Sequence, residues 1–131
     1  MNFITLEEIL LIHEKVVLET GGIFGILNFE AIKSSLERPF SSFEGKEFYP
    51  DLWHKVAVLI HSIISYHPFI DGNKRTALVA GDVCLRLNGY RIRPSEEVEK
   101  FFWEIARGEK SIDDIAKWLQ ENSEPWEERT K

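Results

Sequence analysis

Residues 67–76 read His-Pro-Phe-Ile-Asp-Gly-Asn-Lys-Arg-Thr and lie between the two strongest helical patterns of the chain. The pattern before them, over residues 51–66, is apolar on most sides and is typical of a central buried helix. The proline and the glycine of the stretch break helical continuity, and a second helix is expected over about residues 73–88. The sequence therefore predicts a tight loop between two helices, with the other elements arranged around it.

Most of the remaining chain also has helical periodicity, with no repeat and no low-complexity stretch. Residues 39–50 mix aromatic residues with Ser, Gly and Pro and predict an extended loop or a small hairpin, and residues 90–93 allow one short strand at most. The predicted fold class is all-α, a compact bundle of about six helices, over about residues 5–20, 28–38, 51–66, 73–88, 95–108 and 111–122. We expect a single domain over residues 1–122 and a frayed acidic tail over residues 123–131.

The composition restricts the class of protein. The chain has 131 residues, enough for one domain, and its 44% apolar and 29% charged residues are ordinary for a globular protein. The net charge of −6 disfavours nucleic-acid binding, no apolar run reaches the length of a membrane span, and the first residues do not form a signal peptide. The single cysteine, Cys84, excludes an intramolecular disulfide and is expected to be a small core residue. We therefore expect a cytoplasmic protein that binds neither nucleic acid nor membrane.

The stretch at residues 67–76 combines residue types that suit an anion site. Asn73 is a suitable N-cap for the second helix, and Gly72 allows the backbone to approach a ligand closely. The free N–H groups of a first helical turn and the helix dipole favour an anion, and Lys74 and Arg75 add two positive charges. A solvated Lys-Arg pair is the alternative, but two cations at a helix N-terminus are unfavourable unless an anion compensates them.

Asp71 and His67 add further chemistry to that anion site. A carboxylate beside phosphates suits Mg²⁺, which binds one or two protein carboxylates together with phosphates and water. His67 can accept a proton. A base, a metal ligand and an anion cradle within nine residues are the components of phosphoryl or nucleotidyl transfer, although a structural histidine and a turn-forming aspartate remain alternatives. His54 and His61 lie on one helix face, but no carboxylate or third histidine at helical spacing completes a metal site.

Residues 67–75 resemble the signature of the Fic/Doc family, His-Pro-Phe-x-(Asp/Glu)-Gly-Asn-(Gly/Lys)-Arg, at every specified position. Lys74, where most adenylylating Fic enzymes have glycine, resembles the death-on-curing (Doc) toxin branch. The similarity extends over about residues 3–120 and implies a Fic/Doc-like bundle in which residues 40–49 form a flap. That flap would align a target segment by backbone pairing.

The resemblance also implies a role for each residue of the signature. His67 would be the catalytic base that takes a proton from a hydroxyl of a target protein, and Asp71 would bind Mg²⁺ bridging the phosphates of ATP. Phe69 would anchor the loop in the core. The phosphates of the nucleotide would be bound by Gly72, Asn73, Lys74 and Arg75.

The family implies a Doc-type toxin that transfers phosphate from ATP to a hydroxyl of a target protein in translation, of the elongation factor Tu class. Adenylyl transfer is the alternative, because Gly72 is shared with the adenylylating signature, and a module that binds nucleotide or a partner without catalysis is third. No segment matches the family's inhibitory pattern (Ser/Thr)-x-x-x-Glu-(Gly/Asn), since Phe40 stands four residues before Glu44. We therefore expect no carboxylate of the chain beside Arg75, and inhibition by a Phd-like antitoxin that docks as an amphipathic helix.

Overall fold

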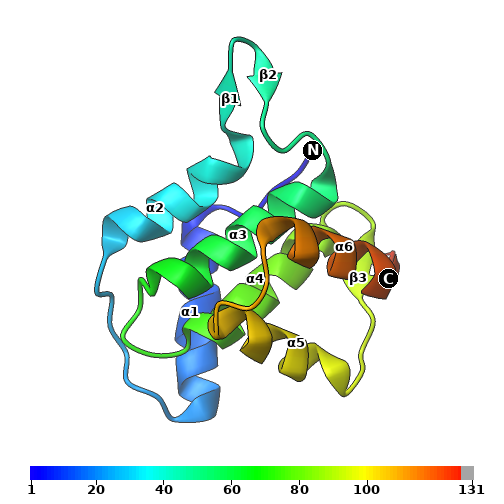
Figure 1. Ribbon diagram of the computed structural model, residues 1–131. Coiled ribbons are helices and arrows are strands. Elements are labelled where there is room, and N and C mark those ends of the chain that lie inside the picture. Colours follow the sequence, from blue (N-terminus) through cyan, green and yellow to red (C-terminus); the bar gives the residue numbers. More distant parts are fainter. Residues whose placement is uncertain (128–131) are drawn as a thin grey trace.

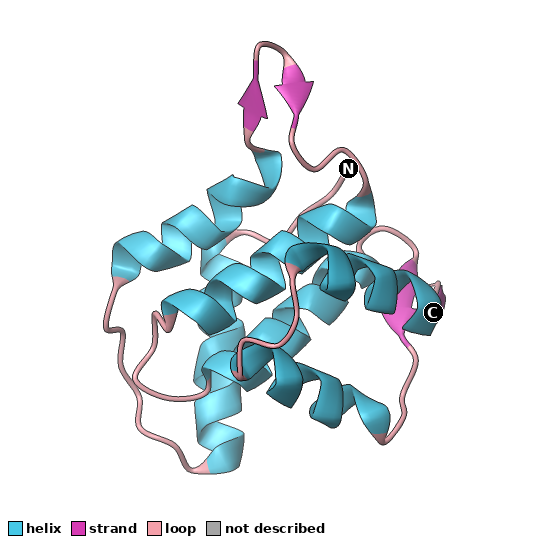
Figure 2. Ribbon diagram, in the orientation of Figure 1, coloured by secondary structure: helices cyan, strands magenta, loops and turns pink. Residues whose placement is uncertain are grey.

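The computed structural model describes residues 1–127, and six α-helices form the body of the protein over that range (Figures 1 and 2). The helices are α1 (Leu6–Thr20), α2 (Phe29–Glu37), α3 (Leu52–Tyr66), α4 (Asn73–Arg86), α5 (Glu97–Ala106) and α6 (Ile112–Asn122). A 3-10 helix (Arg38–Phe40) follows α2, and the strands are β1 (Ser42–Phe43), β2 (Lys46–Glu47), β3 (Tyr90–Ile92) and β4 (Ser123–Pro125). The predicted all-α bundle of about six helices is confirmed.

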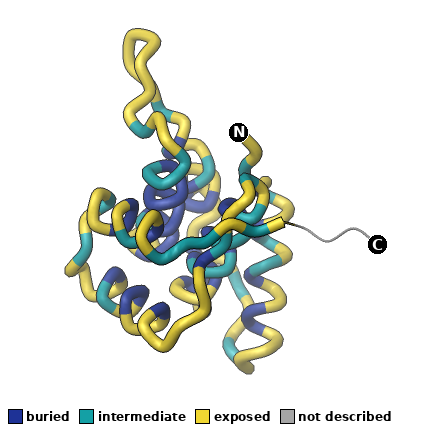
Figure 3. The backbone as a smooth tube through the Cα atoms, turned by 90° about the vertical axis from the view of Figure 1, so that its right-hand side faces the viewer, coloured by how far each residue is buried: buried dark blue, intermediate teal, exposed yellow. Residues whose placement is uncertain are grey.

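Helix α3 lies at the centre of the bundle and packs against α2, α4 and α6. Nine of its 15 residues are buried, which explains why its sequence is apolar on most sides. The buried segments gather in the interior in Figure 3, whereas the hairpin is exposed along its length. No helix within residues 1–127 is long and apolar enough to cross a membrane.

Polar side chains determine where several helices begin. Thr5 and Glu8 form a capping box at the start of α1, and Ser111 and Asp114 form a second one at the start of α6. Asp51 caps α3 by accepting a hydrogen bond from the His54 backbone N–H at 2.8 Å. These caps lie close to the predicted helix starts because they depend on residues only three positions apart.

Strands β1 and β2 form a small antiparallel hairpin that projects from the helical body (Figure 1). Its position within residues 39–50 confirms the predicted loop or hairpin. Phe43 and Phe48 are 65% and 60% exposed, so the aromatic side chains of this segment contribute little to the core.

The predicted frayed tail is wrong for residues 123–126. Strand β4 pairs antiparallel with β3, and the Trp126 N–H donates to the carbonyl of Gly89 at 2.9 Å. Arg91 donates to the Glu124 carboxylate at 2.8 Å. The segment is therefore held by strand pairing and by the ion pair of Glu124 with Arg91 of β3, which sequence spacing alone does not indicate. Residues 128–131 of the predicted tail lie outside the described residues.

Candidate functional site

The loop between α3 and α4 is held by backbone pairing and by a buried aromatic side chain. Residues 25–28 pair with residues 68–70 through three backbone hydrogen bonds of 2.8–3.0 Å. Phe69 is fully buried and stacks on the ring of His13, with the ring centroids 3.7 Å apart. Phe69 is thus a core residue that anchors the loop, as predicted.

His13 is a residue of this site that the sequence analysis did not identify. It is 1% exposed, and its Nε2 lies 2.9 Å from the carbonyl oxygen of Asp71, to which it donates. His13 therefore links α1 to the loop through a hydrogen bond and through the Phe69 ring. One signal was available: His13 occupies the buried face of α1, with Ile9 four residues before it and Val16 three residues after it.

Asn73 has a different role from the predicted N-cap. The N-cap of α4 is Gly72, which has φ +76° and makes no side-chain capping bond. The buried Asn73 amide instead bonds to both backbone groups of Phe69: its Oδ1 accepts from the N–H at 3.0 Å, and its Nδ2 donates to the carbonyl at 2.9 Å. The side chain of Asn73 therefore shapes the loop, and its backbone N–H is left to face an anion.

His67 and Asp71 lie at the two ends of the loop and are both exposed. His67 ends α3 in the left-handed region at φ +52°, a conformation that is uncommon for a residue other than glycine and is concentrated at functional sites. Its side chain makes no hydrogen bond to any residue in the described range. The Asp71 carboxylate accepts from the N–H of Gly72 at 3.0 Å and of Ile23 at 3.2 Å, so its orientation is set by two backbone donors.

The N-terminus of α4 opens into a cleft of about 400 Å³. The first hydrogen bond of the helix runs from the Thr76 N–H to the Gly72 carbonyl at 2.9 Å, which leaves the preceding N–H groups without a partner inside the helix. All six residues that the sequence predicts for the site line this cleft, together with Val16, Thr20, Ile70, Trp103 and Ala106. The structure therefore brings the predicted base, carboxylate and cations to one place. This arrangement can bind an anion and places a proton acceptor, His67, in the same cleft.

The expectation that no carboxylate of the chain lies beside Arg75 is wrong. Glu99 of α5 has its Oε1 3.6 Å from the Arg75 Nη1, and the two side chains are 82% and 50% exposed. Helix α5 packs against α4, which places residues 24 positions apart in contact. No short sequence pattern relates these two positions.

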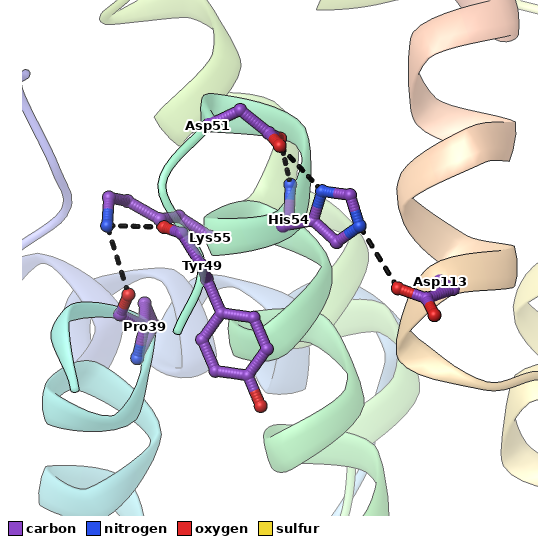
Figure 4. Close-up of polar contacts among 6 residues, drawn as sticks. All are labelled: Pro39, Tyr49, Asp51, His54, Lys55 and Asp113. Atoms are coloured by element: carbon purple, nitrogen blue, oxygen red, sulfur yellow. Dashed lines mark hydrogen bonds and ion pairs between the residues drawn. The ribbon is translucent and has the colours of Figure 1, made fainter. Parts of the chain in front are cut away.

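Lys55 connects the hairpin to the helical body (Figure 4). Its side chain is 3% exposed, and its Nζ donates to the carbonyls of Pro39 and Tyr49 and to the Glu47 carboxylate, at 3.2, 2.6 and 2.8 Å. These partners come from both ends of the hairpin segment. Lys55 was not predicted from the sequence, although a lysine within an apolar helical run indicates a buried and paired charge.

The two histidines of α3 do not share a site. His54 lies between two carboxylates, with Nδ1 2.7 Å from Asp51 and Nε2 3.1 Å from Asp113 (Figure 4). Burial opposes ionisation of Asp51, but its hydrogen bonds from the His54 backbone and side chain outweigh this effect and lower its pKa. Through its contacts with Asp51 and Asp113, His54 joins the starts of α3 and α6. His61 has no part in these contacts, and burial lowers its pKa, as does the positive charge of Arg38.

A magnesium ion fits the residues of the cleft only together with phosphates. Within residues 1–127, no group of three His, Cys, Asp or Glu side chains is arranged to hold a metal ion. Asp71 offers one exposed carboxylate beside the N-terminus of α4. Mg²⁺ commonly binds through one or two protein carboxylates and takes its other ligands from phosphates and water, so Asp71 is a sufficient protein ligand for it.

Comparisons with known proteins agree with this architecture. The model of the "Fic/DOC family" matches residues 3–85, which is more than half of the chain. A protein named "Toxin Doc" from Mycolicibacterium smegmatis is 31% identical over 99 residues, which cover 73% of this chain and 76% of the relative. "Protein kinase doc" from Escherichia phage P1 is 28% identical over 120 residues, which cover 92% of this chain and 94% of the relative. The chain therefore belongs to the Fic/DOC family, in its Doc branch.

Proposed function

We propose that the protein is a Doc-type toxin that transfers the γ-phosphate of ATP to a hydroxyl of a target protein. The observation that carries this proposal is the single cleft that joins His67, Asp71 and the N-terminus of α4 with its two cations. A helix N-terminus with adjacent Lys and Arg side chains suits a polyphosphate. The printed name of the phage relative, a protein kinase, supports the same chemistry.

In this proposal, His67 accepts the proton of the target's hydroxyl group. The hydroxyl oxygen bonds to the γ-phosphorus, the bond from that phosphorus to the bridging oxygen of the β-phosphate breaks, and ADP leaves. Arg75 and the backbone N–H groups of residues 73–75 bind the phosphate oxygens, and Lys74 adds a mobile positive charge. Asp71 would hold Mg²⁺, which neutralises charge on the phosphates when bound. Lys55 positions the hairpin that would align the target segment.

Adenylyl transfer is the second candidate, because Gly72 also fits the adenylylating signature of the family. The target's oxygen would then bond to the α-phosphorus, and pyrophosphate would leave. Lys74 favours phosphate transfer, since glycine is the usual residue there in the adenylylating enzymes. A module that binds nucleotide without catalysis is third, because binding alone requires neither a base nor a metal ligand.

The position of a radioactive label distinguishes these reactions. The protein is incubated with bacterial lysate and Mg²⁺ and with either γ-labelled or α-labelled ATP. Phosphate transfer predicts label on protein from γ-labelled ATP only, adenylyl transfer predicts label from α-labelled ATP only, and a binding module transfers neither. The matched variant is His67→Ala, which is expected to lower transfer by about 10²–10⁴-fold and to leave the thermal unfolding temperature unchanged, because the side chain is exposed. Full transfer by this variant would exclude His67 as the base.

The proposed target is a protein of translation, of the elongation factor Tu class, by resemblance to the family. Expression without a partner should then arrest growth and protein synthesis. Normal growth and undiminished protein synthesis while active protein accumulates would contradict this target.

The proposed partner is a separate Phd-like antitoxin that docks as an amphipathic helix. An apolar groove of about 340 Å³ between α1 and residues 24–26 is suited to such a helix, with Leu11 and Phe24 exposed and with Glu7 and Glu14 among its lining residues. The carboxylates favour basic residues in the partner. Co-purification with the product of the adjacent reading frame, followed by a transfer assay, tests this partner. Full activity in a stable complex would contradict inhibition.

A further inference from the structure

A second pocket, of about 470 Å³, lies between α4 and α5 beside the cleft of the signature loop. Leu78 and the buried Phe102 contribute apolar surface to it, and Lys100 and Glu99 contribute charge. Three residues line both spaces: Lys74, Arg75 and Trp103. The two spaces therefore adjoin along the N-terminal turn of α4.

Trp103 is an unusual residue for the surface of α5. The neighbouring aromatic residues Phe101 and Phe102 are buried, whereas Trp103 is 53% exposed and borders both spaces. The Arg107 guanidinium lies over its ring, 4.9 Å from the centroid. A planar group stacking on the indole would use the ring face opposite Arg107. Burial in the core therefore does not explain this side chain.

The charges of the pocket indicate which flat ligand fits. Lys74, Arg75 and Lys100 surround it with three positive charges against the one carboxylate of Glu99. An aromatic surface beside cations and an apolar wall suits a nucleobase that is attached to phosphates. A purely apolar ligand would use none of these cations.

We propose that the α4–α5 pocket receives the nucleoside of the bound nucleotide and that its base stacks on Trp103. This inference rests on the proposed function and deepens it. His67 and Asp71 line only the first cleft, so a nucleotide with its last phosphate at His67 runs past Arg75 and leaves its nucleoside at Trp103. That direction presents the γ-phosphate to His67, as phosphate transfer requires.

Calorimetric titration with ATP and with inorganic tripolyphosphate, each with Mg²⁺, tests the inference. Stacking on an aromatic side chain contributes about 1–3 kcal/mol per base, so Trp103→Ala should weaken ATP binding about 5- to 150-fold. Tripolyphosphate has no base, and its affinity should change less than about two-fold. Trp103→Phe, which keeps an aromatic ring, should restore most of the ATP affinity. Phe29→Ala removes an exposed aromatic residue outside both spaces and should leave both affinities unchanged.

Three results would overturn the inference. In the first, Trp103→Ala weakens the binding of ATP and of tripolyphosphate equally. In the second, Trp103→Ala binds ATP as tightly as the wild-type protein does. In the third, the wild-type protein binds ATP no more tightly than tripolyphosphate. A failure of the proposed function is recognised separately. If Trp103→Ala weakens the binding of ATP but not of tripolyphosphate, and the wild-type protein transfers no label from ATP, the result supports the nucleoside pocket and contradicts the transferase activity.

Discussion

Replacement of Asn73 by alanine tests whether this residue of the signature shapes the loop. The Asn73 side chain is 5% exposed, and its two hydrogen bonds to Phe69 are both buried. Asn73→Ala leaves the N–H and the carbonyl of Phe69 without partners. Each unpaired buried group costs about 1–3 kcal/mol, so the free energy of unfolding should fall by about 2–6 kcal/mol. This is a large part of the total of about 5–15 kcal/mol that is typical of a folded protein.

Urea denaturation followed by circular dichroism measures this loss. Asn73→Asp keeps an acceptor for the Phe69 N–H but places a carboxylate oxygen, which cannot donate, against the Phe69 carbonyl, so it should also be less stable than wild type. Lys74→Ala is the control, because this exposed neighbour should change the free energy of unfolding by less than about 0.5 kcal/mol. A loss of less than about 1 kcal/mol in Asn73→Ala, accompanied by loss of ATP binding, would refute the structural role and favour direct contact with phosphate.

Three further predictions concern the backbone, the ion pair and the cysteine. Gly72→Ala should lower the free energy of unfolding by about 1–2 kcal/mol, because the backbone of Gly72 is left-handed. The loss should exceed that of Gly21→Ala, since an added Cβ at Gly72 would lie 3.2 Å from the Val16 side chain and one at Gly21 would meet nothing within 4 Å. Equal losses in urea denaturation would contradict the close contact at Gly72. Glu99→Gln should change ATP affinity by less than about five-fold in calorimetry, because an exposed pair such as Arg75–Glu99 contributes about 0–1 kcal/mol; a larger gain would make Glu99 an inhibitory residue. Burial raises the pKa of the Cys84 thiol to about 12, so iodoacetamide at pH 8 should modify this thiol only after unfolding. Mass spectrometry follows the modification, and rapid modification of the native protein would contradict the burial of Cys84.

The helices were largely predictable because their signals are local. The apolar pattern of residues 51–66 and the capping box at Thr5 involve residues within a few positions of one another, and each corresponds to an observed helix. The signature at residues 67–75 was equally local and led to the family that the comparisons show. Asn73 was misjudged because an asparagine before a helix satisfies the usual N-cap pattern, whereas its side chain here bonds to Phe69 within the core.

The sequence by itself determined the helical bundle, the loop between two helices and the six signature residues that line the cleft. Only the tertiary structure decided what surrounds them: His13 beneath Asp71 from 58 positions away, Glu99 beside Arg75, and the pairing of β4 with β3. The physical reason is the range of the interactions. Caps and helical periodicity depend on backbone bonds and side chains within about four residues, so they can be identified along the chain. Contacts between distant segments depend on how α1 and α5 pack against α4, and no short pattern encodes that packing.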